Sequence, residues 1–299
     1  MILAMLTCNY LGRFAPSPTG ALHAGSLATA LGSWLHARGH HGKWLLRIED
    51  LDLPRCVPGS DKIIISQLAA CGLHWDGEIV YQSQRTHLYQ EALDQLIQQQ
   101  MAFACRCTRK QIEDAWAALG KKKQKHEELI YPGTCRDRHD VAEPCAWRLK
   151  VRDEDLRQSV GDFVLKRADG IFTYQLAVVV DDALQGITHI VRGADLLDNT
   201  PRQIYLQEQL AYSRPQYLHL PLVLNEQHEK LSKQTQAPAI ATDSSEKALN
   251  ALRAAGQHLG LTNPQLFENK PWSISLWLDN ATQDYMKISG SSCYFNRVN

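Results

Sequence analysis

The feature that most constrains the fold is a strand, loop and helix pattern near the start of the chain. An apolar run over residues 11–15 ends at Pro16-Ser-Pro-Thr-Gly20, and large apolar residues then recur at helical spacing through Leu35. Because prolines and glycines interrupt regular structure, we expect a strand, a loop and a helix in that order. Residues 43–48 predict a second buried strand. Strands that alternate with helices favour an α/β fold with a doubly wound parallel sheet of the Rossmann type.

The remaining chain predicts further elements and one insertion. Helices are expected at 61–71, 86–99, 111–119, 201–212, 244–259 and 263–267, and strands at 145–151, 162–166, 171–180 and 219–224. The apolar, β-branched run 171–180 is typical of a strand that returns to the central sheet. The pattern breaks near residue 105, where we expect an inserted subdomain. After residue 267 we expect an aromatic and less regular tail.

Charge and hydropathy limit the partners of the chain. The 32 Lys and Arg balance 32 Asp and Glu, which disfavours nonspecific binding to nucleic acid through phosphate charge. Residues 101–150 nevertheless hold 11 basic and 7 acidic side chains, so any contact with a polyanion should be local. No run of about 18 uncharged apolar residues is present, and the start lacks a basic segment, so we expect a cytoplasmic protein without a membrane partner.

Two polar segments are candidates for binding a nucleotide. His23, Gly25 and Ser26 stand where the first helix begins, and unpaired N–H groups at a helix start attract phosphate. The alternative is a capped helix with a surface histidine. Lys230, Ser232 and Lys233 follow the last expected strand, and two ammonium groups there would stabilise charge on a departing pyrophosphate. Taken alone, this second segment is also typical of a solvated turn.

Three clustered cysteines predict a structural zinc site. Cys105, Cys107 and Cys135 supply three thiolates, and the usual fourth ligand would be His126, His139 or Cys145. The alternative is three buried free cysteines. Four protein ligands would leave no position for a catalytic water, which is why we expect a structural role.

Four separated segments resemble the glutamyl branch of class I aminoacyl-tRNA synthetases. They are Arg13-Phe-Ala-Pro-Ser17-Pro-Thr-Gly with His23-Ala-Gly-Ser, Arg47-Ile-Glu49-Asp-Leu-Asp52, Val191-Arg192-Gly-Ala-Asp-Leu, and Lys230-Leu-Ser-Lys233. The resemblance covers residues 11 to about 238. It implies a Rossmann catalytic core at 1–104 and 168–237, an inserted zinc-binding and tRNA-contacting subdomain at 105–167, and a helical stem-contact region at 238–299.

The resemblance also assigns site residues. Glutamate carries two carboxylates and one ammonium, so its pocket needs cations and an anion. The implied glutamate site is Arg13, Phe14, Ala15, Pro16, Ser17, Glu49, Tyr174 and Arg192. The implied ATP site, used with Mg²⁺, is His23, Gly25, Ser26, Lys230, Ser232 and Lys233. Singly, the charged residues are also typical of surface ion pairs. Tyr131 is implied as the fourth ligand of one Zn²⁺ per chain. Larger members carry Asn where this chain has Val178, which predicts a weaker affinity for glutamate.

Chain length separates two branches of that family. About 60 residues follow Pro238, which we expect to exclude the usual anticodon-binding domain. The chain therefore resembles truncated members that activate glutamate without tRNA and transfer it to queuosine at the wobble position of tRNA(Asp). A monomer is expected. The alternatives are a fragmentary glutamyl-tRNA synthetase that charges the tRNA 3′ end, and an inactive RNA-binding paralogue. The Lys121–Lys125 run would touch tRNA phosphates or form a solvated loop.

Overall fold

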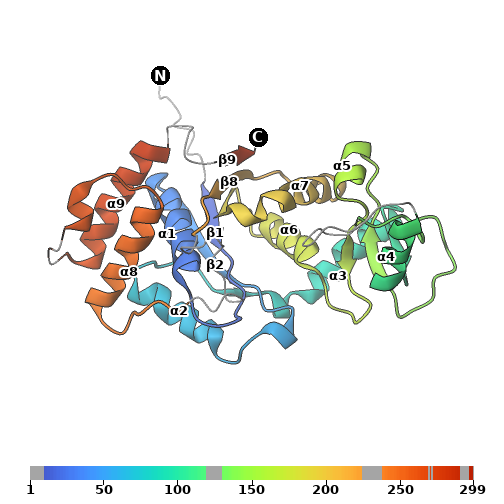
Figure 1. The fold of residues 1–299 in the computed structure, drawn as a ribbon, viewed down its shortest axis with the longest axis horizontal. Helices are drawn as coiled ribbons and strands as arrows, with labels where there is room; N and C mark the ends of the chain where they lie inside the picture. The colour runs from blue at the N-terminus through green and yellow to red at the C-terminus, as the bar shows by residue number, and fades with distance from the viewer. Residues whose placement is uncertain are drawn as a thin grey trace, which may run out of the picture. The chain divides into compact units, whose positions relative to one another are not determined.

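The chain folds into two compact units. A computed structural model describes residues 10–118, 130–223, 238–268, 270, 272–289 and 296–298 (Figure 1). The first unit comprises Met1–Ser83, Gly186–Leu197 and Pro215–Asn299, and the second comprises Gln84–Gln185 and Asp198–Arg214. These boundaries follow chain packing and differ from the three functional parts expected from the sequence.

Parallel strands form the centre of the first unit. The strands there are β1 (Leu11–Phe14), β2 (Lys43–Ile48), β3 (Val80–Tyr81), β7 (His189–Gly193), β8 (Gln216–Leu220) and β9 (Asn296–Val298). The pairs β1–β2, β2–β3 and β7–β8 are parallel, and β9 joins β8 antiparallel. Thr188, just before β7, donates its N–H to the carbonyl of Leu11, the first residue of β1, at 2.9 Å. Strands β1 and β7 therefore start at the same edge, which confirms the predicted parallel α/β fold.

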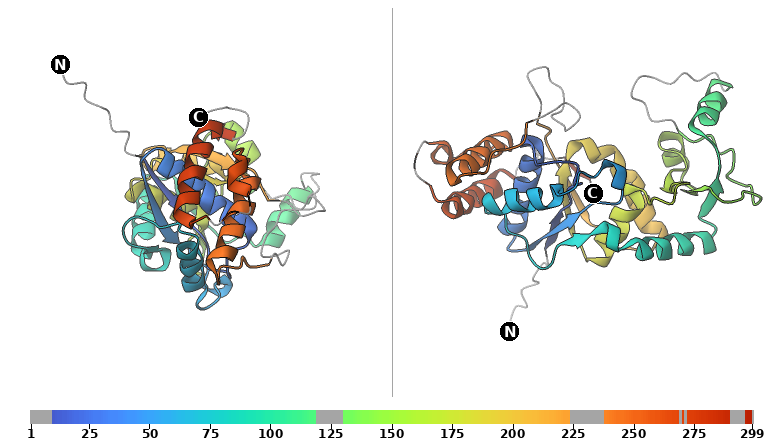
Figure 2. Two further views of the ribbon diagram at one scale, coloured as in Figure 1. Left: turned by 90° about the vertical axis from the view of Figure 1, so that its left-hand side faces the viewer. Right: turned by 90° about the horizontal axis from the view of Figure 1, so that it is seen from below.

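The described residues of the first unit also form four α-helices. They are α1 (Ala24–Gly39), α2 (Ser60–Ala70), α8 (Ser245–His258) and α9 (Ile274–Ser289). Helix α1 packs against both α8 and α9, which lie side by side in Figure 2. Its leucines Leu27, Leu31 and Leu35 are almost fully buried, because strands cover one side of the helix and helices another.

The expectation of a less regular tail after residue 267 is wrong, because α9 spans half of it. Trp277, Ala281 and Tyr285 recur every four residues and are fully buried, so they form one apolar stripe. The indole N–H of Trp277 donates to the Leu266 carbonyl at 3.0 Å. Burying such a stripe stabilises a helix whose sequence also contains several polar residues.

The second unit combines helices with a small antiparallel sheet. Its elements are α3 (Thr86–Gln98), β4 (Ala102–Cys105), α4 (Arg109–Ala118), β5 (Ala146–Leu149), α5 (Glu154–Ser159), β6 (Val164–Lys166), α6 (Tyr174–Leu184) and α7 (Thr200–Gln209). Strands β4, β5 and β6 pair in that order. The helices expected near 86–99, 111–119 and 201–212 are confirmed within a few residues.

The predicted strand at 171–180 is wrong, because most of it belongs to helix α6. Residues Leu176 to Val180 are all nearly fully buried, and a helix that is buried on every side shows no amphipathic period. Asp181 also faces the interior of the unit: it accepts hydrogen bonds from the Arg85 side chain at 2.6 Å and the Tyr89 hydroxyl at 2.7 Å. Side chains from α3 and from the residue just before it therefore satisfy the Asp181 carboxylate, which the predicted strand end would have placed in solvent.

Short 3₁₀ segments complete the described chain. They lie at Leu53–Arg55, Gln82–Gln84, Ala194–Asn199 and Pro264–Phe267. Among the residues that the structure describes, no helix has the length and apolar character needed to cross a membrane.

Candidate active site

The loop after β1 lies against the chain that follows β2. The carbonyl of Pro16 accepts the N–H of Glu49 at 3.0 Å, and the carbonyl of Pro18 accepts the N–H of Val57 at 2.9 Å. Gly20 closes the loop with φ +135°, a conformation that side-chain-bearing residues rarely adopt. The loop is therefore fixed at the carboxyl ends of two neighbouring parallel strands, the edge where open α/β sheets bind ligands.

His23 caps helix α1 with its own imidazole. Its Nδ1 accepts the backbone N–H groups of Gly25 at 3.1 Å and Ser26 at 3.4 Å. A neutral imidazole that accepts through Nδ1 carries its proton on Nε2. That Nε2 lies 2.9 Å from the hydroxyl of Ser26. The backbone of α1 thus selects the tautomer that presents an N–H donor at the helix start, which is the group a phosphate oxygen needs.

Charged side chains gather near the carboxyl ends of β1, β2 and β7. Arg13 on β1 is 4% exposed and Arg192 on β7 is 3% exposed. Glu49 directly follows β2, and its side chain is 9% exposed, with Oε1 3.7 Å from Nη2 of the fully buried Arg47. Three buried guanidinium groups and a nearly buried carboxylate are costly unless they are paired, so the charges at this edge need partners of opposite sign.

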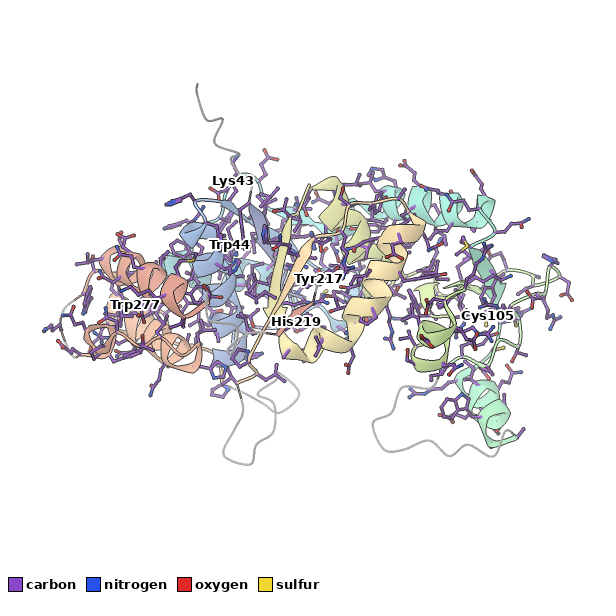
Figure 3. The ribbon with its side chains drawn as sticks, turned by 90° about the horizontal axis from the view of Figure 1, so that it is seen from above. Lys43, Trp44, Cys105, Tyr217, His219 and Trp277 are labelled. Atoms are coloured by element: carbon purple, nitrogen blue, oxygen red, sulfur yellow. The ribbon has the colours of Figure 1, made fainter. Side chains whose placement is uncertain are left out.

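Arg192 is held by groups of its own unit. Its Nη2 donates to the Leu196 carbonyl at 3.1 Å, and its Nε donates to Nε2 of His219 at 3.3 Å. The guanidinium carbon lies 5.1 Å from the centre of the Tyr217 ring. Figure 3 labels Tyr217 and His219 on strand β8. A side chain at Gly193 would place its Cβ 2.5 Å from the Asp195 carboxylate, so the Asp195 side chain would have to move to admit it.

The other residues expected to bind glutamate have different settings. The Phe14 ring is buried parallel to the Trp44 indole, with centroids 6.1 Å apart, so only its backbone is available to a ligand. Ala15 and Pro16 are half-buried in the loop after β1, and Ser17 is exposed there. Tyr174 is the first residue of α6 and belongs to the second unit.

Several sequence-based assignments lie outside the described residues. They are Lys230, Ser232 and Lys233 of the expected ATP site, the alternative zinc ligand His126, and the Lys121–Lys125 run.

The three clustered cysteines come together in the second unit, where Figure 3 labels Cys105 at the end of β4. The sulfur atoms of Cys105, Cys107 and Cys135 lie within 4.8 Å of one another, and Cys107 and Cys135 are 3.5 Å apart. Among the described residues they are the one group of His, Cys, Asp or Glu side chains that could share a metal ion. The Tyr131 hydroxyl joins them at 3.4 Å from Cys105 and 3.5 Å from Cys107.

The thiols of this group differ in acidity. Burial raises the pKa of Cys107 to about 11. Burial also acts to raise the pKa of Cys135, but hydrogen bonds from the Tyr131 hydroxyl, the Arg106 backbone and the neighbouring thiols outweigh it and lower that pKa. Cys145 and the exposed His139 do not belong to the group. The geometry therefore favours Tyr131 over these two as a fourth ligand.

Comparison with known proteins identifies the family. A family model described as the catalytic domain of class I tRNA synthetases (E and Q) matches residues 11–258. A glutamyl-Q tRNA(Asp) synthetase of Albidiferax ferrireducens is 52% identical over 92% of this chain and 99% of its own. One from Cupriavidus metallidurans is 50% identical over 93% of this chain and 92% of its own. The chain belongs to the glutamyl-Q tRNA(Asp) synthetase family.

Solved structures agree with this membership. A glutamate-tRNA synthetase from Elizabethkingia anophelis superposes with a TM-score of 0.72 at 25% identity, over 90% of this chain and 65% of that one. A glutamate tRNA ligase from Elizabethkingia meningosepticum, solved with its amino acid, gives 0.70 at 26% identity, over 90% of this chain and 64% of its own. The glutamyl-Q tRNA(Asp) synthetase family is thus one of class I aminoacyl-tRNA synthetase-like ligases, and this member is an enzyme.

One contact in this glutamyl-Q tRNA(Asp) synthetase family member was not expected from the sequence. His219 was assigned to a strand but given no role, yet its ring reaches Nε of Arg192. The signal was the alternation Tyr217-Leu-His219, which puts two aromatic rings on one face of β8. Only the register of β8 against β7 shows that this face meets Arg192.

Proposed function

We propose that this chain activates L-glutamate with ATP in the absence of tRNA and transfers it to the cyclopentenediol of queuosine, at the wobble position of tRNA(Asp). The observation that carries the proposal is the pair of buried arginines, Arg13 and Arg192, with Glu49 at the carboxyl ends of adjoining strands. This set has the charge pattern of a glutamate pocket, two cations for carboxylates and an anion for an ammonium. The names of the relatives support the nucleoside and the tRNA.

Each glutamate-binding residue has a distinct role in the proposal. Arg13 and Arg192 pair with carboxylates, Glu49 with the α-ammonium, and the Tyr174 hydroxyl donates to the side-chain carboxylate. Ser17 and the backbone of Phe14, Ala15 and Pro16 line the pocket. Since Leu196, His219 and Tyr217 hold Arg192, the pocket is ordered by the protein itself. That ordering supports activation without RNA.

Activation joins the glutamate carboxylate to the α-phosphate of ATP and releases pyrophosphate. The His23 Nε2–H, the N–H groups near Gly25 and Ser26, and the Lys230-Leu-Ser232-Lys233 segment stabilise the charge that develops. Mg²⁺ bound with ATP supplies further neutralisation of the phosphates. The protein acts by orientation and electrostatics, since no proton must be removed from an ionised carboxylate. In the second step a hydroxyl of the diol attacks the carbonyl carbon of the mixed anhydride. The ester forms as the acyl–phosphate bond breaks and AMP leaves, and an adenylate phosphate oxygen takes the hydroxyl proton.

We also propose one structural Zn²⁺ held by Cys105, Cys107, Tyr131 and Cys135. Tetrahedral coordination with Zn–S bonds of about 2.3 Å separates two sulfurs by about 3.8 Å. The observed sulfur separations, from 3.5 Å to no more than 4.8 Å, and the nearby Tyr131 hydroxyl fit that donor set. The metal would anchor the start of the segment after β4 to the segment that carries Tyr131 and Cys135.

The proposal divides the chain by function. Residues 1–104 and 168–237 form the catalytic core, 105–167 the zinc-binding and tRNA-contacting part, and 238–299 the stem-contact region. The part at 105–167 contains the basic side chains counted in residues 101–150. We therefore expect the enzyme to contact RNA over a small area there. We propose that it works as a cytoplasmic monomer.

Transfer of labelled glutamate to tRNA(Asp) tests the nucleoside. We expect labelling of tRNA(Asp) that carries queuosine and none of tRNA(Asp) that carries guanosine there. Brief periodate treatment destroys both the cyclopentene diol and the 3′-terminal ribose diol, so a tRNA with a 2′,3′-dideoxy end serves as the control. Labelling that persists on the dideoxy tRNA supports the queuosine diol as acceptor. If glutamate tRNA is labelled and the label is lost when its terminal diol is removed, the enzyme instead charges the 3′ end.

A further inference from the structure

The contacts of Arg192 indicate a role for His219, which is not one of the residues proposed to bind glutamate. Arg192 and His219 are register partners in the parallel pair β7–β8, so their side chains project from the same face. Both are almost fully buried, at 3% and 2% exposure. The contact between them is therefore screened from water and holds its geometry better than a surface pair would.

The contact fixes the protonation state of His219. A guanidinium has N–H donors and no acceptor, so the bond of 3.3 Å from Arg192 Nε requires a lone pair on His219 Nε2. The imidazole is therefore neutral, with its proton on Nδ1. A neutral ring accepts from Arg192 without cancelling its charge, whereas a carboxylate at the same place would compete with a substrate carboxylate for the guanidinium.

Three contacts together fix the position of the guanidinium. The Leu196 carbonyl takes one N–H of Nη2, and His219 takes the N–H of Nε. The Tyr217 ring lies under the guanidinium, 5.1 Å from its central carbon, and is parallel to the His219 ring within 4°. In a guanidinium, the end that carries Nη1 and Nη2 is the part that pairs bidentately with carboxylates.

We propose that His219 is a positioning residue, whose Nε2 accepts the Nε–H of Arg192 and so aims the guanidinium at a substrate carboxylate. This inference rests on the proposed function, since it gives Arg192 a carboxylate ligand. It predicts that losing the acceptor weakens glutamate binding while ATP binding is preserved.

Substitutions at position 219 separate the acceptor from the bulk of the ring. His219→Gln puts an amide oxygen near the place of Nε2, His219→Asn puts one near Nδ1, and His219→Leu removes the acceptor. His74→Leu and His74→Gln are matched controls on an exposed histidine of the same unit. The readouts are the KM for glutamate, the KM for ATP and kcat in ATP–pyrophosphate exchange without tRNA, together with the melting temperature of each variant.

We expect His219→Leu and His219→Asn to raise the KM for glutamate about 10-fold to 100-fold, the scale of one hydrogen bond to a charged group. The KM for ATP should stay within about two-fold, and His219→Gln should restore the KM for glutamate to within about three-fold. If His219→Leu does not fold, the comparison of Gln with Asn gives the same test.

Three outcomes would overturn the role, and the first two are distinguishable from a failure of the proposed function. A folded His219→Asn or His219→Leu variant with the wild-type KM for glutamate would remove the positioning role and leave the proposed function intact. A folded His219→Gln variant as weak as His219→Asn would do the same, because the acceptor would then not matter. A wild-type protein without glutamate-dependent exchange would overturn the proposed function and, with it, this role for His219.

Discussion

The Nε2 atom of His23 lies 2.9 Å from the hydroxyl of Ser26, while Nδ1 of the same ring caps helix α1. One imidazole therefore serves two purposes. Its Nδ1 stabilises the helix, and its Nε2 faces the Ser26 hydroxyl at the helix start, where we propose that ATP phosphates bind.

Replacing His23 with asparagine should separate these two purposes. Asparagine is among the best N-cap residues, so we expect its amide oxygen to replace Nδ1 and the melting temperature to stay nearly unchanged. The donor at Nε2 is lost, and kcat for ATP–pyrophosphate exchange should fall by about 10²-fold to 10³-fold, as for other donors that stabilise developing charge. Calorimetry and exchange kinetics on the same sample check both parts. Near wild-type exchange in a stable His23→Asn variant would contradict the role of Nε2.

Arg192→Leu should abolish activation of glutamate, because the pocket loses a buried cation that pairs with a carboxylate. Arg192→Lys keeps the charge but not the planar fork, and we expect a loss of about 3 kcal/mol, or about 100-fold in kcat/KM. Arg138→Leu, on a half-exposed arginine, is the control. The measurement is glutamate-dependent exchange, and unchanged exchange in Arg192→Leu would refute the assignment.

Metal analysis tests the cysteine group and its fourth ligand. We expect one zinc per chain in the wild type and in Cys145→Ala, and much less in Cys107→Ser or Cys135→Ser. Tyr131→Phe should retain zinc less tightly in competition with a chelator, since water must replace the phenolate. Zinc removal should lower the melting temperature, because metal that binds only the folded state stabilises it. A wild-type protein purified without zinc, and insensitive to added zinc, would rule out the site.

A histidine cluster at the opposite edge of the first unit predicts a pH dependence of stability. His36, His40 and His189 line a cavity of about 100 Å³, and Tyr10 stacks on His189 with ring centroids 4.1 Å apart. Burial, and then the nearby His40, lower the pKa of His189 from 6.5 to about 4. Between those two values the unfolded chain binds a proton that the folded chain does not, so stability is lost as the pH falls.

The loss from His189 should be about 1 kcal/mol between pH 7.5 and 5, after allowance for the partial exposure of the ring. Urea unfolding at both pH values measures it in the wild type and in His189→Gln. The variant should show a smaller difference between the two pH values. Equal differences in the two proteins would show that His189 does not titrate as described.

The sequence predicted the parallel core because the first strand, loop and helix follow strong local rules. It failed at α6 and α9 for a different reason. A fully buried run such as Leu176 to Val180 has no period that separates strand from helix, and only the distant partners Arg85 and Tyr89 show where Asp181 points. For α9, the buried stripe of Trp277, Ala281 and Tyr285 was present in the sequence but interleaved with polar residues.

The site shows the same division between local and distant information. The position of His23 at the start of α1 and the three cysteines were accessible from short motifs, whereas the cap that His23 makes was not predicted. The contact between Arg192 and His219 was not, because residues 27 apart meet only through the register of two strands.

ATP–pyrophosphate exchange with L-glutamate, measured without any tRNA, tests the central proposal most directly. We expect exchange that depends on glutamate, saturates with it and is unaffected by removing RNA with nuclease. Exchange that occurs only when tRNA is added, or none with glutamate under any condition, would contradict the account.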